Sequence, residues 1–187
     1  MLLIVGLGNP GNEYENTPHN MGRRCVFRFA EEHGFEAFHA EKKFNALVSE
    51  KTADGQKIIA VLPETFMNNS GDAVSAIAAF YKITAEGIWV LNDDADIPLG
   101  AIRIAFGGGS AGHHGIESIA EKLGTTDFWR FRIGIGQKEP LTIPLEAYVL
   151  QKDAIGTAAE KDIAAKVNNL LELALEKSLE EAQKNAD

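Results

Sequence analysis

Short apolar runs alternate along this chain with longer segments in which apolar residues recur at helical spacing, and this alternation constrains the fold most. Strand-like runs occupy residues 2–7, 47–50, 57–62, 88–91, 101–106 and 131–135. Helix-like segments occupy residues 20–33, 69–82, about 114–123, and 153–186. Because strands that alternate with helices build layered α/β folds, we expect one α/β domain over residues 1–187.

The turn Ala53-Asp54-Gly55 lies between two strand-like runs and is typical of a hairpin. A hairpin adds an antiparallel pair, so we expect a mixed, twisted β-sheet flanked by α-helices. Residues 153–186 are predicted to form a long charged C-terminal helix or a pair of helices. Their apolar stripe should pack onto the domain, with docking of a partner as the alternative; it comprises Ile155, Ala159, Ile163, Val167, Leu170 and Ala174.

Composition narrows the class of protein. With 187 residues, 45% of them hydrophobic, the chain can bury a full core. Its one cysteine, Cys25, cannot form an internal disulfide, which fits a reducing compartment, and we expect a plain buried thiol. No apolar run approaches the roughly 20 residues that span a membrane. The start lacks the marks of a signal peptide. We therefore expect a cytoplasmic protein without a membrane partner.

The first strand-like run ends in Gly6-Leu7-Gly8-Asn9-Pro10-Gly11, which matches G-x-G-x-x-G. This pattern alone is a weak indication of dinucleotide binding. Pro10 removes a backbone donor that a pyrophosphate site needs, and Pro18 disfavours a helix directly after the turn. What remains is Asn9 at the carboxyl end of a strand, where α/β sheets usually place ligands.

Three further polar clusters follow or flank strand-like runs. His19 precedes a helix, where it can be exposed enough to act as a base or can be an ordinary surface residue. Residues 92–96 hold three acids, one of which could orient a histidine; a solvated loop or a divalent-ion site are the alternatives. Asn68 or Asn69 could simply cap the next helix. If the clusters converge at one sheet edge, they form a hydrolase-like site with His19 and an acid.

Residues 107–115 form the fourth cluster, with glycine-rich sequence that lets another molecule approach the backbone closely. Ser110 lacks the Gly-x-Ser-x-Gly elbow of a nucleophilic serine. Metal binding is weakly supported, because no second ligand cluster has recognisable spacing.

Taken together, these blocks resemble the bacterial-type peptidyl-tRNA hydrolase family. The resemblance is carried by residues 6–11, Tyr14, His19-Asn20-Met21-Gly22, residues 63–71, 93–100, 107–115 and 130–136, in the family's order and spacing. It implies an esterase that cuts the bond between a peptide and the 3′ ribose of tRNA. It also implies a monomer that uses neither a metal nor an organic cofactor.

The resemblance also implies roles for individual residues. His19 would be the general base that activates a water, and Asp93 would hold its tautomer and stabilise its charged form. Asn9 and Asn68 would position substrate and water. The remaining residues expected to contact substrate are Tyr14, Met67 and His114.

The chain departs from the family pattern on the side of tRNA binding. His114 stands where the family usually has Asn, and Ala105 and Glu117 stand where it typically carries bases. We expect Arg103 and Arg132 to contact tRNA. With a net charge of −9, binding should be weak and strongly salt-sensitive. The competing hypotheses are a non-catalytic RNA-binding relative, an esterase or amidase for small acyl substrates and, last, a dinucleotide enzyme.

Overall fold

A computed structural model describes residues 1–137 and 139–186 of the protein. Seven strands form one sheet in the order β2-β3-β4-β1-β5-β7-β6. The strands are β1 (Leu2–Gly6), β2 (His39–Glu41), β3 (Ala46–Ala53), β4 (Gln56–Pro63), β5 (Ile88–Pro98), β6 (Ile102–Phe106) and β7 (Trp129–Gly136). The α-helices are α1 (Met21–Glu32), α2 (Ser70–Tyr81), α3 (His114–Leu123), α4 (Leu145–Val149), α5 (Thr157–Glu176) and α6 (Leu179–Lys184).

The sheet is mixed, as predicted. Strand β1 runs parallel to β4 and β5, and β5 runs parallel to β7. The antiparallel pairs are β2 with β3, β3 with β4, and β6 with β7. The predicted hairpin joins β3 to β4, and its turn residues Asp54 and Gly55 both have positive φ, 49° and 76°. Two consecutive positive values match the turn whose twist suits paired strands.

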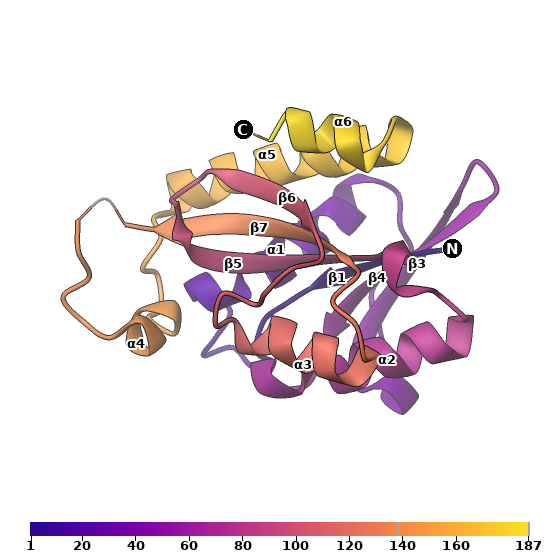
Figure 1. The fold of residues 1–187 in the computed structure, drawn as a ribbon, viewed down its shortest axis with the longest axis horizontal. Helices are drawn as coiled ribbons and strands as arrows, with labels where there is room; N and C mark the ends of the chain where they lie inside the picture. Colours follow the sequence, from indigo (N-terminus) through magenta and orange to yellow (C-terminus); the bar gives the residue numbers. More distant parts are fainter. Residues whose placement is uncertain (138, 187) are drawn as a thin grey trace.

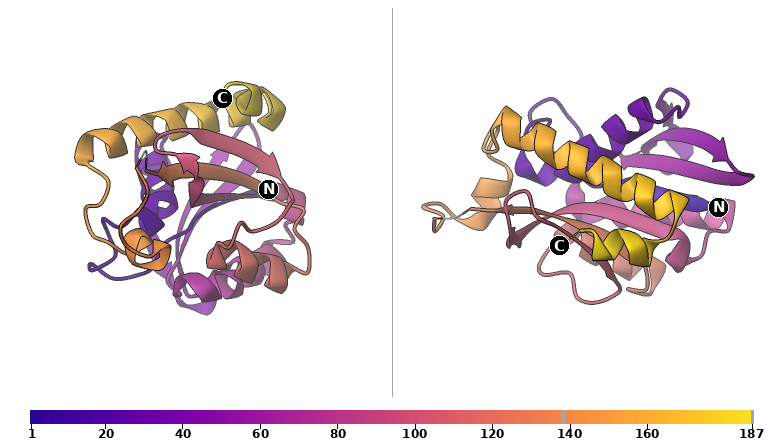
Figure 2. Two further views of the ribbon diagram at one scale, coloured as in Figure 1. Left: turned by 60° about the vertical axis from the view of Figure 1, so that its left-hand side comes forward. Right: turned by 90° about the horizontal axis from the view of Figure 1, so that it is seen from above.

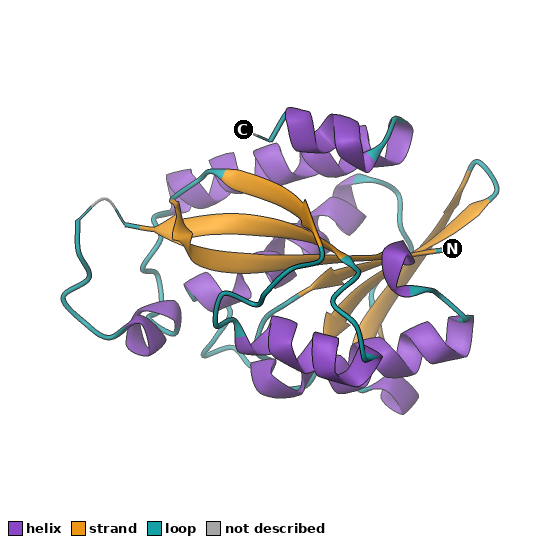
Figure 3. Cartoon of the chain, viewed as in Figure 1, coloured by secondary structure: helices purple, strands orange, loops and turns teal. Residues whose placement is uncertain are grey.

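Helices cover both faces of the sheet (Figures 1 and 3). Helices α2 and α3 lie on one face, and α1, α5 and α6 on the other (Figure 2). Two buried apolar clusters fill the space between these layers. Alternate residues of β1 supply both clusters, with Ile4 in one and Leu3 and Val5 in the other. Because helices cover both faces, the central strand β1 is apolar throughout.

The C-terminal segment forms two helices rather than one. The first ends at Glu176, and the extended residue Ser178 caps the second, because its hydroxyl oxygen accepts from the Glu181 N–H at 3.2 Å. The predicted stripe packs on the domain: five of its six residues are buried, Ala159 partly so. Cys25 is also buried, as expected, and burial raises its pKa to about 12. Within the described residues, no helix is both long and apolar enough to cross a membrane.

Two of the differences from the sequence-based predictions bear on the cleft described below. Strand β5 was expected to end at Leu91 but continues to Pro98, so the acids expected to follow this strand belong to it. The cause is pairing with β7, where Asp93 is opposite Ile133 and Asp94 is opposite Gly134. A neighbouring strand thus overrides the local polarity. Helix α4 was not predicted at all, because its five residues are too few for a periodic pattern.

Candidate active site

A cleft of about 670 Å³ lies at the carboxyl ends of the central strands. The predicted clusters converge there: Asn9 follows β1, Met67 and Asn68 follow β4, and Asp93 lies in the second half of β5. His19 and the glycine-rich loop before α3 complete this wall. The unpredicted α4 and the residue after it also line the cleft, with apolar Leu145, Val149 and Leu150 and with Glu146.

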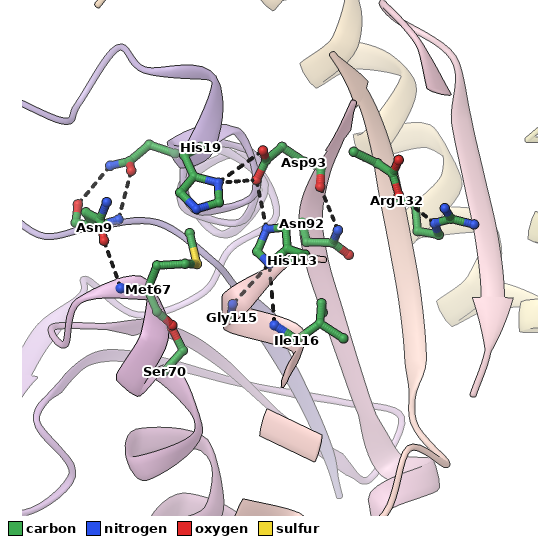
Figure 4. A network of polar contacts seen from close by, with 12 residues as sticks. Asn9, His19, Met67, Ser70, Asn92, Asp93, His113, Gly115, Ile116 and Arg132 are labelled. Carbon is green, nitrogen blue, oxygen red and sulfur yellow. Dashed lines mark hydrogen bonds and ion pairs between the residues drawn. The ribbon is translucent and has the colours of Figure 1, made fainter. Parts of the chain in front are cut away.

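His19 and Asp93 form a hydrogen-bonded pair, as the residue types had suggested. His19 lies in a single 3-10 turn, Pro18–Asn20, directly before α1. Its Nδ1 is 2.9 Å from Asp93 Oδ1 and 3.1 Å from Oδ2 (Figure 4). An ionised carboxylate only accepts, so Nδ1 carries the proton. In the neutral ring Nε2 is then unprotonated and can accept a proton.

His113 also bonds to Asp93, a contact that the sequence analysis missed. It lies at the N-cap of α3, where its Nδ1 accepts from the N–H groups of Gly115 at 3.2 Å and Ile116 at 3.4 Å. Because Nδ1 accepts, the proton lies on Nε2, which donates to Asp93 Oδ1 at 2.9 Å (Figure 4). His113 is therefore held neutral in one tautomer. In the sequence, His113 stands immediately before a predicted helix, at a position where side chains that accept hydrogen bonds often cap the helix.

Asp93 is almost completely buried, with 3% of its surface exposed. Burial by itself would raise the pKa of this carboxyl, but the imidazoles of His113 and His19 more than compensate and hold the pKa well below its usual range. The hydrogen bonds that both rings donate to the carboxylate favour its ionised form. Asp93 is consequently a carboxylate throughout the neutral range.

His19, Asp93 and His113 place three potential ligand atoms within 4.8 Å of one another. A cation on Nε2 of His113 would move the ring proton to Nδ1, which already faces two N–H donors. A cation on Nδ1 of His19 would displace the donor to Asp93. The arrangement therefore suits a hydrogen-bond network better than a metal.

Asn9 is fixed by three hydrogen bonds. Its N–H donates to Asn20 Oδ1 at 2.8 Å, and its carbonyl accepts from Asn20 Nδ2 at 2.9 Å. Its Oδ1 accepts from the Met67 N–H at 2.8 Å. These contacts leave the Asn9 amide NH₂ as the group that can donate into the cleft. Asn20 holds the N-cap position of α1 without a side-chain cap bond, because its side chain bonds the Asn9 backbone instead.

The glycine pattern after β1 serves packing and not phosphate binding. The Leu7 N–H donates to Leu91 O at 3.1 Å and the Asn9 N–H donates to Asn20 Oδ1, so two of the loop's backbone donors are already occupied. A Cβ on Gly6 would lie 2.7 Å from the carbonyl oxygen of Gly22, so glycine lets α1 approach β1 closely. This geometry argues against a pyrophosphate site.

Met67 and Asn68 lie in the 3-10 turn Met67–Asn69 that precedes α2. Met67 is buried beside Gly115, whereas Asn68 is exposed and lines the cleft. The alternative that Asn68 or Asn69 caps α2 was wrong: Asn69 holds the cap position without a side-chain cap bond. Nearby, the rings of Tyr14 and Phe66 pack edge to face with centroids 6.2 Å apart, and both line the cleft.

His114 lies at the mouth of the cleft, with its side chain 69% exposed. Its Nδ1 is 3.1 Å from Glu117 Oε2, and Ser110 Oγ donates to Glu117 Oε1 at 2.9 Å. Glu117 therefore bonds Ser110 within the glycine-rich loop and His114 at the end of that loop. The pKa of Glu117 is lowered, first by the hydrogen bond with His114 and next by that from Ser110.

The two arginines predicted to contact tRNA lie side by side on one face of the sheet. Arg103 of β6 and Arg132 of β7 are partners in the antiparallel register. Arg103 is exposed, whereas Arg132 Nε donates to Asp94 Oδ2 at 2.7 Å (Figure 4). Asp94 thus offsets part of the positive charge of this face.

Comparisons with known proteins agree with this geometry. The sequence model of the family described as peptidyl-tRNA hydrolase matches residues 3–187. A peptidyl-tRNA hydrolase of Neisseria meningitidis is 45% identical over 153 residues, which are 80% of this chain and 77% of that protein. One of Francisella tularensis subsp. novicida is 41% identical over 167 residues, which are 89% of this chain and 85% of that protein.

A solved structure supports the same assignment. The crystal structure of peptidyl-tRNA hydrolase from Acinetobacter baumannii superposes with a TM-score of 0.89 at 31% identity. The superposition covers 100% of this chain and 94% of that one. Sequence and fold agree over nearly the full length, and this chain belongs to the peptidyl-tRNA hydrolase family.

Proposed function

We propose that this protein hydrolyses the ester bond that links a peptide to the 3′ ribose of tRNA and releases both products. The observation that carries the proposal is the His19–Asp93 pair, held at 2.9 Å in a cleft that Asn9 and Asn68 also line. In a chain of this family, such a pair supplies a base where an activated acyl ester can bind.

His19 is the general base of this proposal. Its unprotonated Nε2 takes a proton from a water molecule as the water oxygen attacks the ester carbonyl. The ring becomes an imidazolium, and the buried carboxylate of Asp93 stabilises that charge. The tetrahedral intermediate then collapses, and the ribose 3′ oxygen leaves with the proton that the imidazolium returns. Water adds across the ester, and His19 ends in its starting state.

Asn9 and Asn68 are the candidates for stabilising the oxyanion that develops on the carbonyl. Asn9 presents an amide NH₂ whose oxygen is already bonded to the Met67 N–H, so the donor's orientation is fixed. Fixed donors stabilise a developing charge without reorganising during the reaction. Tyr14, Met67 and His114 line the same cleft and are proposed to contact the substrate.

His113 has a positioning role in this scheme. Because it is neutral, it adds no charge next to the imidazolium of His19. It donates to Asp93 Oδ1, the same oxygen that accepts from His19, and so fixes the plane of the carboxylate. The ring is anchored in turn by two N–H groups of α3. Removing it should loosen Asp93 without removing its charge.

The tRNA is proposed to lie against Arg103 and Arg132. The chain's net charge of −9 opposes a polyanion, so the affinity should fall steeply as salt rises. We propose that the protein works as a cytoplasmic monomer over residues 1–187, as one domain without metal or organic cofactor. The support is the hydrogen-bonded, self-contained site within one chain.

The test is release of peptide from N-blocked aminoacyl-tRNA at low salt, with free aminoacyl-tRNA as the second substrate. Wild type should cleave only the blocked substrate, and His19→Ala should abolish this activity while still binding tRNA. No cleavage by wild type would instead favour the non-catalytic RNA-binding relative. Cleavage of both substrates would indicate an esterase with relaxed specificity, and would implicate the altered His114 position.

A further inference from the structure

The loop between β6 and α3 forms a wall of the cleft and passes through several left-handed residues. Gly107 and Gly108 have φ values of 64° and 85°, and Ala111 and Gly112 have values of 52° and 75°. Its Ser110–Gly112 part lines the cleft, and His113, which bonds Asp93, follows directly. The position of this loop therefore decides where His113 lies.

Arg130 of β7 holds this loop from below. Its Nη1 donates to the carbonyl oxygen of Gly109 at 2.6 Å, and its Nη2 donates to that of Gly107. A Cβ on Gly108 would lie 3.1 Å from Nη2, so the loop passes directly over the guanidinium. Arg130 is only 6% exposed, which removes it from the set of basic residues that can reach a phosphate.

A buried cation that contacts only neutral acceptors does little for stability. Removing its charge from water costs free energy that two carbonyl bonds repay only in part, and burial accordingly lowers the pKa of Arg130. Its planar fork, however, can bond two carbonyls two residues apart, which a lysine ammonium on a flexible stem does poorly. The contact is therefore suited to fixing a loop conformation.

Arg130 also relates the position of the loop to that of the Asp93 carboxylate. Arg130 is paired with Val90 of β5, and three residues further along the two strands Ile133 is paired with Asp93. Asp93 and the loop are thus positioned by the same pair of strands, β5 and β7. We propose that Arg130 is a positioning residue for hydrolysis: it fixes residues 107–112, and through them His113, relative to Asp93.

This inference rests on the proposed hydrolase function for its kinetic test. Arg130→Met keeps the volume without donors, and Arg130→Lys keeps the charge without the fork. Both should lower kcat on N-blocked aminoacyl-tRNA by about 10- to 100-fold per folded molecule, as a misplacement of about 1 Å can. KM should change little. Arg28→Met, on the exposed face of α1, is the matched control with unchanged kinetics.

Salt dependence separates this role from phosphate binding. If Arg130 contacted tRNA, its removal would reduce the slope of log affinity against log salt by about one. We expect an unchanged slope for both Arg130 variants. Unchanged kcat, or a slope reduced by one, would overturn the proposal. A lower melting temperature with normal kcat per folded molecule would also overturn it, because Arg130 would then be structural only.

Hydrogen exchange tests the same proposal without any turnover. Amides of residues 107–113 should exchange faster in Arg130→Met, while those of β7 keep their protection. Equal loop exchange in wild type and variant would contradict the anchoring role, whatever the activity. If wild type itself failed to hydrolyse the substrate, the hydrolase function would fail, and exchange would still decide whether Arg130 fixes the loop. If Arg130→Met does not fold, Arg130→Lys supplies both measurements.

Discussion

Replacing Asp93 by asparagine tests the electrostatic basis of the site. In the wild type, Oδ1 accepts from both His19 and His113 at 2.9 Å, and Oδ2 accepts from His19 at 3.1 Å. In Asp93→Asn the amide can keep its oxygen at the first position, but an NH₂ group then faces the Nδ1–H of His19. The two donors repel, and His19 is driven to the tautomer whose Nε2 carries the proton and cannot act as a base.

The expected loss of rate in Asp93→Asn follows from the lost negative charge of the carboxylate. At about 4 Å and an effective dielectric constant of about 20, a carboxylate stabilises an imidazolium by about 4 kcal/mol, or about 10³-fold in rate. We therefore expect kcat to fall by about three orders of magnitude, with KM nearly unchanged because Asp93 does not face the bulk of the substrate. Single-turnover cleavage of N-blocked aminoacyl-tRNA measures this directly.

The control removes the same charge from the neighbouring exposed residue, as Asp96→Asn, and should leave kcat unchanged. Asp93→Asn activity within tenfold of wild type would refute the reasoning.

The pH dependence of stability in the wild type gives a second check on the charge of Asp93. The pKa of Asp93 is lowered in the folded state, so its contribution to stability is complete above the unfolded pKa near 4 and is lost only as pH falls through the folded pKa. The stability that Asp93 contributes should therefore be lost only below about pH 4, and Asp93→Asn should lack this part of the pH dependence.

Three further outcomes are expected. Gly22→Ala should destabilise the fold by about 3 kcal/mol or more, because the alanine Cβ would lie 2.1 Å from Leu91 O. Urea unfolding measures this change, and a loss of stability below about 1 kcal/mol would contradict the close approach of α1 to β5. Asp94→Asn frees Arg132, so tRNA binding at low salt should tighten and become more salt-dependent; unchanged binding would count against a role for Arg132. Cys25, with its pKa raised to about 12, should resist iodoacetamide at pH 8 until the protein unfolds, and rapid native labelling would exclude its burial.

Much of the sheet was predictable because its strands carry their signal locally. β1, residues 58–62 of β4 and residues 88–91 of β5 are apolar without interruption, and the Asp54-Gly55 turn fixes the hairpin. The second half of β5 was not predictable in this way. Asp93 and Asp94 are polar residues that extend a strand because β7 pairs with them, and no local pattern contains that partner.

The site was predictable to a different degree for each residue. His19, Asp93, Asn9 and Asn68 follow strands in sequence, so their convergence at one sheet edge could be expected. His113 and Asn20 could not be assigned in the same way. Each looks like a helix-start residue, and each is one, but its second partner lies far away in sequence: Asp93 is 20 positions from His113, and Asn9 is 11 from Asn20.

The cap of α3 has a consequence for local unfolding. His113 satisfies two N–H groups at the start of this helix with one ring nitrogen and bonds Asp93 with the other. The first turn of α3 therefore cannot fray without releasing the carboxylate, and a displaced carboxylate removes support from the helix start. Most helix ends open at little cost in free energy. Opening the start of α3 also breaks the hydrogen bond between His113 and Asp93. The His19–Asp93 pair and the end of α3 should thus open and close as one cooperative unit.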